Sequence, residues 1–201
     1  MPNLINMKRK NRIEEYCETT FNCLKANVHN WGKPEYSRPI SRIYYSGVFD
    51  CGNPNPTGLI SENALYNKMH KLKTVKDHYL SPQFVGRMIL DNPQIYLEDY
   101  EQFREIFIKC THTILVTQAE NENLSSLTKN TDGEYTVYIP TNLKYNHSDI
   151  KLYKREKNFS RWNEENCIPL ESNILDDVPV ELLEYEKDYL VKPNGLSVLL
   201  P

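Results

Sequence analysis

The segment KDHYLSP, residues 76–82, sets the framework for interpreting the rest of the chain. It closes a basic stretch, and its Ser81-Pro82 pair predicts the start of a helix because proline is preorganised for the first helical position. Residues 74–78 are short enough to form a strand that carries His78 at its end. The adjacent Asp77 and His78 are therefore the best candidates for chemistry in this sequence.

A second segment, HTILVTQAEN at residues 112–121, predicts a strand that runs into a helix. Residues 111–116 are rich in β-branched side chains, which favour strands. Thr117 and Glu120 have the spacing of a capping box, which opens a helix with Leu124 and Leu127 as its apolar positions. Asn121 is then expected in the first turn of that helix or just past it.

Together the two segments resemble the His-Me finger nucleases, the HNH group. In that family one strand ends in Asp-His, and a second strand ending in Asn or His is followed nine residues later by a metal-binding Asn or His inside a helix. His112 and Asn121 have this spacing here. The resemblance covers about residues 74–128 and implies an α+β fold with a ββα-metal core, in which the helices predicted over 82–109 form an insertion.

The resemblance implies a general-base role for His78, which would activate water. An unperturbed histidine suits that role because its pKa of about 6.5 lies near neutrality. Asp77 and the amide oxygen of Asn121 would hold Mg²⁺ or Mn²⁺, a sparse ligand set that suits a cation that keeps several of its waters.

Two further residues complete the implied site. His112 would orient the His78 loop, and Arg87 could clamp a phosphate because a guanidinium group binds phosphate in a bidentate manner. Asn92, fourteen residues after His78, competes with His112 for the middle position of the motif.

The remaining segments are expected to surround this core within one domain, residues 1–201. Gly32, Pro34 and Pro39 are expected to break the chain, and Ser61 is a plausible helix N-cap. Apolar periodicity and turn signals predict an appended N-terminal helix, four elements before residue 110 and a C-terminal β-rich region with an acidic tail. The ranges are helix 9–28, β-rich segment 43–49, helix 61–72, helix 82–91, helix 97–109 and strand 134–139.

The composition is that of a soluble globular protein, with 39% hydrophobic and 25% charged residues. The chain has no apolar run long enough to span a membrane and no signal-peptide pattern at its N-terminus. We therefore expect it in the cytoplasm, that of the host cell if a phage encodes it. The five cysteines include no Cys-x-x-Cys pair and are expected to be reduced and mostly buried.

Charge is segregated along the chain. Residues 1–90 contain 13 Lys and Arg against 7 Asp and Glu, whereas residues 91–201 contain 11 against 20. A local cationic face can bind a polyanion even when the net charge is negative. Ordinary surface variation is the alternative. The candidate nucleic-acid contacts before Asp77 are Lys68, Lys71, Lys73 and Lys76.

A second basic stretch, residues 143–162, interleaves cations with aromatic side chains, as nucleic-acid surfaces do. The candidate contacts there are Lys154, Arg155 and Arg161. The alternative interpretation is a solvated strand pair whose aromatic side chains belong to the core.

These observations predict a metal-dependent endonuclease that hydrolyses double-stranded DNA, of the small kind that phages and mobile elements carry. The alternative is a non-enzymatic accessory protein that binds nucleic acid or a protein. A hydrolase with a cysteine nucleophile is disfavoured, because no cysteine lies beside a histidine in a strand-to-helix setting. Twofold recognition of DNA would imply a homodimer, but no heptad pattern indicates one.

Overall fold

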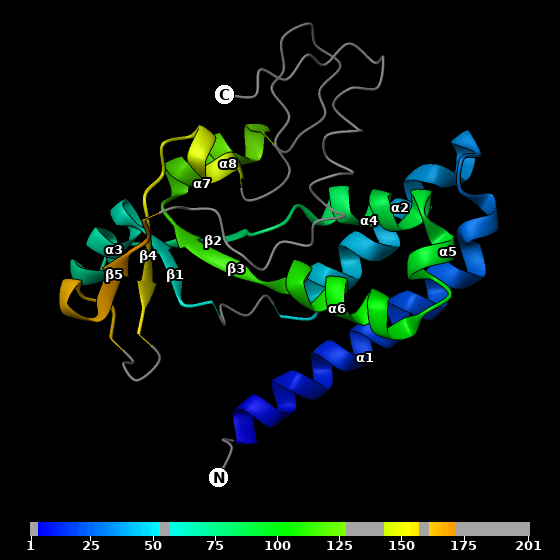
Figure 1. Ribbon diagram of the computed structural model, residues 1–201, viewed down its shortest axis with the longest axis horizontal. Coiled ribbons are helices and arrows are strands. Elements are labelled where there is room, and N and C mark those ends of the chain that lie inside the picture. The colour runs from blue at the N-terminus through cyan, green and yellow to red at the C-terminus, as the bar shows by residue number, and fades with distance from the viewer. Residues whose placement is uncertain (1–3, 53–56, 128–142, 157–160, 172–201) are drawn as a thin grey trace, which may run out of the picture. The chain divides into compact units, whose positions relative to one another are not determined.

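The computed structural model describes residues 4–52, 57–127, 143–156 and 161–171, with the side chains of residues 4–11 and Ser37 left out. These residues form helices and one open, mixed five-stranded sheet, which confirms the predicted α+β class (Figure 1). The chain divides into two compact units, Met1–Pro54 with Leu80–His112 and Asn55–Tyr79 with Thr113–Pro201. The single-domain assignment stays a prediction.

The first unit is helical. Its core contains Cys17, Phe21 and Leu24 on one face of the first helix, as the apolar spacing predicts, and Phe103 lies edge-on to Phe21 with ring centroids 5.3 Å apart. Tyr44 is fully buried among these rings. The elements are α1 (Leu4–Asn27), η1 (Val28–Asn30), α2 (Pro34–Asp50), α4 (Pro82–Asp91), α5 (Pro93–Tyr96) and α6 (Tyr100–Thr111).

The predicted β-rich segment at residues 43–49 is wrong, because these residues belong to α2. Pro34 occupies the start of that helix, where proline is well tolerated, and Pro39 lies inside it without ending it. Ile40, Tyr44 and Val48 are buried at intervals of four residues. Burial of this helical stripe outweighs the β propensity of the two tyrosines and the valine.

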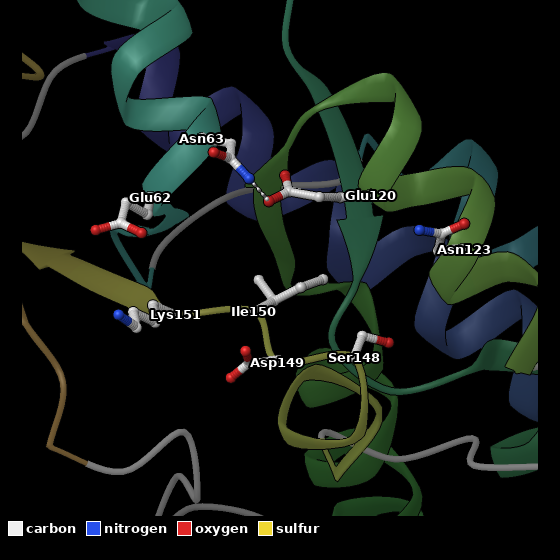
Figure 2. Close-up of a pocket in the computed structure, with 8 residues that line it drawn as sticks. All are labelled: Glu62, Asn63, Glu120, Asn123, Ser148, Asp149, Ile150 and Lys151. Atoms are coloured by element: carbon white, nitrogen blue, oxygen red, sulfur yellow. Dashed lines mark hydrogen bonds between the residues drawn. The ribbon is translucent and has the colours of Figure 1, made fainter.

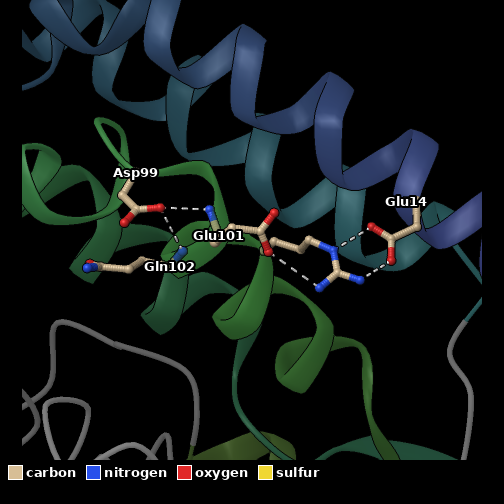
Figure 3. A network of polar contacts seen from close by, with 5 residues as sticks. Glu14, Asp99, Glu101 and Gln102 are labelled. Carbon is tan, nitrogen blue, oxygen red and sulfur yellow. Dashed lines mark hydrogen bonds and ion pairs between the residues drawn. The ribbon is translucent and has the colours of Figure 1, made fainter.

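A polar network ties α6 to α1 (Figure 3). Arg104 donates to both carboxylate oxygens of Glu14, including Nε to Oε2 at 2.8 Å, and also pairs with Glu101. The hydrogen bonds from Arg104 to Glu14 raise the pKa of the guanidinium group. Asp99 caps α6 by accepting from the amides of Glu101 and Gln102.

The second unit contains the sheet, with strand order β2-β3-β1-β4-β5. β1 and β3 are parallel, and the other neighbouring pairs are antiparallel. The strands are β1 (Leu59–Ser61), β2 (Val75–His78), β3 (Thr113–Val116), β4 (Leu152–Arg155) and β5 (Cys167–Pro169). The helices of this unit are α3 (Glu62–Met69), α7 (Gln118–Leu127), α8 (Leu143–His147) and η2 (Glu164–Asn166).

The two predicted strands and the helix after the second are present, although β3 begins at Thr113 because Thr111 ends α6 and His112 follows it. β2 pairs with β3 so that Asp77 lies opposite Ile114 and His78 opposite Thr113. Thr117 and Glu120 form the predicted capping box at the start of α7, with Thr117 N donating to Glu120 at 2.7 Å and Glu120 N donating to Thr117 Oγ1 at 3.2 Å.

The register also sorts side chains between the two faces of the sheet, because directly paired residues share a face and neighbours along a strand alternate. Ile60, Leu115 and Tyr153 share the face that packs against Ala64 and Leu65 of α3. We call this the α3 face. The opposite face is covered by α7, which packs against β2 and contacts α8.

α3 begins at its predicted N-cap, since Ser61 Oγ accepts from Ala64 N at 3.1 Å. It ends three residues earlier than predicted. Lys71 adopts a left-handed backbone with φ of 58°, and Leu72 N bonds back to Asn67 O, which is the Schellman arrangement. Leu72, the last residue of the predicted helix 61–72, therefore lies beyond the helix and is 54% exposed.

Other expectations have mixed outcomes. Four of the five cysteines are buried, and Cys23 is exposed. Burial raises the pKa of Cys17 to about 12.

In the described ranges no helix has both the length and the apolar character needed to cross a bilayer. The predicted strand 134–139 and residues 172–201 of the predicted tail lie outside the described residues.

Gly47 tests the packing of α1 on α2. A Cβ at this position would lie 2.1 Å from Oγ1 of Thr20, a buried side chain with a stiff χ1. Gly47→Ala should lower the free energy of unfolding measured in urea, because overpacking costs about 1–3 kcal/mol and alanine regains only about 1 kcal/mol of helix propensity. Ser46→Ala, at an exposed neighbouring position, is the matched control. A stabilised Gly47→Ala variant would contradict this packing.

Candidate functional site

Asp77 is a buried carboxylate on an edge strand. It is 8% exposed, and its alternation with His78 places it on the face of the sheet covered by α7. Local sequence explains how it gets there: β2 follows the Lys71 turn and runs antiparallel to β3, so Asp77 lies beside the apolar Ile114. A carboxylate in such surroundings needs compensating partners.

Lys144 and Tyr145 of α8 supply those partners. Lys144 Nζ lies 2.7 Å from Asp77 Oδ2 and donates at 2.7 Å to the main-chain oxygen of His78. The Tyr145 hydroxyl donates to the same Oδ2 at 2.5 Å. Burial, followed by the charge of Asp77, raises the pKa of the Tyr145 phenol and keeps it protonated as a donor.

α8 is held in place by its C-terminus. Ile150 N bonds to Tyr145 O at 2.9 Å and Asp149 N to Asn146 O at 3.1 Å, with Asp149 in a left-handed conformation at φ 51°. This is a second Schellman arrangement, and it fixes the short helix before β4 begins. The side chain of Lys144 is 1% exposed, so the ammonium is enclosed by protein.

His78 points to the opposite face from Asp77. It is 8% exposed, and Lys144 holds its main-chain oxygen. By the register, the histidine shares the α3 face with Lys76, which is exposed on the same strand. Adjacent residues of one strand thus present the predicted base and the predicted metal ligand to different sides.

Arg87, His112 and Asn92 belong to the first unit. Arg87 is half-buried in α4, the amide of His112 bonds to Lys109 O at the end of α6, and Asn92 Nδ2 donates to Met88 O at 2.9 Å. The predicted roles of His112 and Arg87 at the Asp77–His78 pair, and of Asn92 as a competitor, stay predictions.

Glu120 is a second buried carboxylate. The local sequence predicted its contact with Thr117 but not its other partners. It accepts from Ser61 Oγ at 2.6 Å and Asn63 Nδ2 at 3.0 Å, in addition to the Thr117 amide. Because β1 and β3 are parallel, the helices that follow them begin side by side, and Glu120 is bound by groups at both N-termini. Asn121 follows Glu120 in α7 and is half-buried.

A polar hollow of about 230 Å³ lies next to this carboxylate. Figure 2 shows Asn63 and Glu120 pointing toward each other beside it, with Asp149, Ile150 and Lys151 of the segment between α8 and β4 on another side. Across the described parts of the chain, no three His, Cys, Asp or Glu side chains gather closely enough to hold a metal ion.

The residues present do not fit the implied Mg²⁺ or Mn²⁺ site at Asp77. The ammonium of Lys144 already lies on Oδ2, the oxygen that also accepts from Tyr145. Two unit charges 4 Å apart repel by about 4 kcal/mol at an effective dielectric of 20, and a divalent ion doubles this figure. A cation bound at about 2.1 Å from the same oxygen would meet that repulsion beside an ammonium group whose side chain is only 1% exposed.

The predicted nucleic-acid contacts fall into two groups. Lys68, Lys71, Lys73 and Lys76 are exposed on α3, the turn after it and β2. The register places Lys154 on the opposite face from Lys76, and Lys154 is exposed. The guanidinium carbon of Arg155 lies 4.3 Å from the ring centroid of Trp162. Lys154 and Lys76 therefore do not form one continuous surface across the sheet.

Sequence comparison adds no assignment. Protein-family profiles, curated proteins and solved structures were compared with the chain, and none matched.

The Asp77–Lys144 pair predicts a strong coupling in stability. Lys144→Met should lower the free energy of unfolding by about 3–5 kcal/mol, because it leaves Asp77 buried without its ammonium partner. Adding Asp77→Asn should recover most of that loss by removing both charges. Urea unfolding measures both effects, and Lys151→Met, at an exposed position, should stay within about 0.5 kcal/mol of wild type. Additive losses in the double variant would contradict the pairing.

Glu120 gives a separate stability prediction. Glu120→Gln places an amide donor where three donors already converge, so the variant should lose about 1.5–3 kcal/mol, the usual contribution of hydrogen bonds to a charged group. Thermal and urea unfolding report the change. Glu122→Gln, on the exposed side of the same helix, is the control. Equal stabilities for the two variants would argue against the Glu120 network.

Proposed function

We propose that this chain is a DNA endonuclease of the His-Me finger type, with His78 as the general base. The observation that carries the proposal is the arrangement of β2, β3 and α7. The strand that ends in Asp77-His78 pairs antiparallel with the strand after His112, and that second strand continues into the helix that contains Asn121. This strand–strand–helix order agrees with the resemblance, whereas His112 precedes the second strand, β3, instead of ending it.

The long connection between the two strands is compatible with this core. After Tyr79 the chain contributes α4, α5 and α6 to the first unit, and it returns to the second unit at Thr113. These helices have their own core with α1 and α2, which includes Phe84, Phe103 and Phe107. They therefore support an insertion within the finger.

A substrate surface is available on the side of the sheet that His78 faces. The exposed side chains of Lys68, Lys71, Lys73 and Lys76 lie on α3, the following turn and β2, and Lys76 shares the α3 face with His78. Lysines bind phosphates as flexible point charges and release counterions from DNA. This group supports double-stranded DNA as the partner.

In the proposed reaction, the imidazole of His78 removes a proton from water as the water oxygen attacks the phosphorus atom. A new P–O bond forms, the bond from phosphorus to the ester oxygen breaks, and the leaving oxygen takes a proton from solvent. Lys144 holds the main chain of His78 during this step. We route no step through a cation at Asp77, because Lys144 lies on that carboxylate.

A second candidate is a DNA-binding protein without hydrolytic activity. It is favoured by the burial of His78, which is 8% exposed, because a general base must come within hydrogen-bonding distance of the attacking water. In this case the same lysines would hold DNA, and the Asp77–Lys144 pair would only stabilise the fold.

Plasmid cleavage separates the two candidates. Wild-type protein is incubated with supercoiled DNA in Mg²⁺, in Mn²⁺ and in EDTA, beside His78→Ala and the control His147→Ala, an exposed histidine of α8. We expect His78→Ala to lose about 10²–10⁴-fold in rate, the usual contribution of a general base, and His147→Ala to cut normally.

The outcomes are distinct. Uncut plasmid in all three conditions, together with salt-sensitive binding that weakens when the four lysines are changed to glutamine, selects the binding protein. Full cutting by His78→Ala removes His78 as the base. Neither cutting nor binding rejects both candidates.

A further inference from the structure

Asp77, Lys144 and Tyr145 form a buried polar cluster on the α7 side of the sheet. Lys144 and Tyr145 are 1% and 0% exposed, and both donate to one oxygen of Asp77. Lys144 also reaches the main chain of the next residue, His78, at 2.7 Å. One side chain therefore neutralises the carboxylate and positions the strand end that carries the proposed base.

We infer that the ammonium of Lys144 takes the place of a divalent cation at Asp77, so that this chain binds no metal there and Lys144 acts as a positioning residue for His78. The meaning of this inference for catalysis rests on the proposed function. The claim that Asp77 binds no metal does not rest on the proposed function, and it can be tested without measuring DNA cleavage.

The geometry supports a lysine as a permanent occupant. The ammonium has two acceptors at 2.7 Å, and it lies in a helix whose C-terminus is fixed by the bonds from Asp149 and Ile150. Tyr145, the next residue, donates to the same carboxylate oxygen, so the helix contributes two adjacent donors at once. A buried carboxylate with a charged and a neutral donor has the compensation that a bound cation and its waters would otherwise supply.

Asp77 then has a different role from the one that the resemblance implies. Its carboxylate acts as the counter-ion of Lys144 and does not ligate metal, and Asn121 loses its implied partner in a metal site. Cleavage by this chain is then independent of a cation at Asp77.

The test measures Mn²⁺ binding by titration calorimetry on the full chain, without DNA. Wild type and Asp77→Asn should give the same Mn²⁺ titration. Lys144→Met frees the carboxylate, so it should bind Mn²⁺ at least about 10-fold more tightly than wild type, and Lys144→Arg should behave like wild type. Asp77→Asn/Lys144→Met, a pair without buried charge, should lose the gained site and serves as the folded reference if a single variant unfolds.

A wild-type Mn²⁺ site that disappears in Asp77→Asn, or in the double variant, would overturn the inference and leave the nuclease proposal standing. Unchanged weak binding in a folded Lys144→Met variant would also overturn it. Plasmid that stays uncut, combined with the expected titrations, would instead reject the nuclease and leave Lys144 as the substitute for the cation. Cutting in EDTA that is lost in His78→Ala would support both.

Discussion

A buried ion pair joins the edge strand β2 to α8. Asp77 and Lys144 are far apart in sequence, yet their charged groups meet at 2.7 Å, and the same ammonium bonds to the main chain of His78. An isolated carboxylate under α7 and α8 would be strongly destabilising, so the presence of Asp77 on this face requires a partner of opposite charge. The position of α8, the enclosure of Tyr145 and the fixing of the end of β2 all follow from that requirement.

Glu120 shows a different solution to the same problem on the same face of the sheet. Its carboxylate is compensated by two side-chain donors and an amide, at a point where two helix N-termini are neighbours. There the neutral donors and the helix dipoles stabilise the carboxylate. The carboxylate in turn satisfies donors that would otherwise lack a hydrogen-bond partner. Asp77 lies near the end of an edge strand, and it takes an ammonium from Lys144 in the first turn of α8. The two sites explain why one carboxylate closes a helix cap while the other fixes a strand end.

Much of the fold was predictable from local pattern, because the signals were short-range. The strand before Ser81, the helix that starts at Pro82 and the Thr117–Glu120 capping box depend on neighbours within four residues. The failures have non-local or unusual causes: α2 is helical because Ile40, Tyr44 and Val48 are buried against other helices, and α3 stops where Lys71, not glycine, adopts a left-handed backbone. The Lys144–Asp77 pair carries no sequence signal, because a lysine in a basic stretch has the pattern of a surface residue until the fold encloses it.

The alternation of a strand has a consequence for the chemistry of this site. In metal-assisted hydrolysis with a histidine base, the histidine and the cation act on the same phosphate. β2, however, directs His78 toward the α3 face and Asp77 toward α7. The lysines that can hold a phosphate lie on α3 and around it, on the side that His78 faces. In the proposed nuclease, charge compensation for a phosphate at His78 would come most directly from side chains such as Lys76, while Lys144 holds the main chain of the strand from the other side.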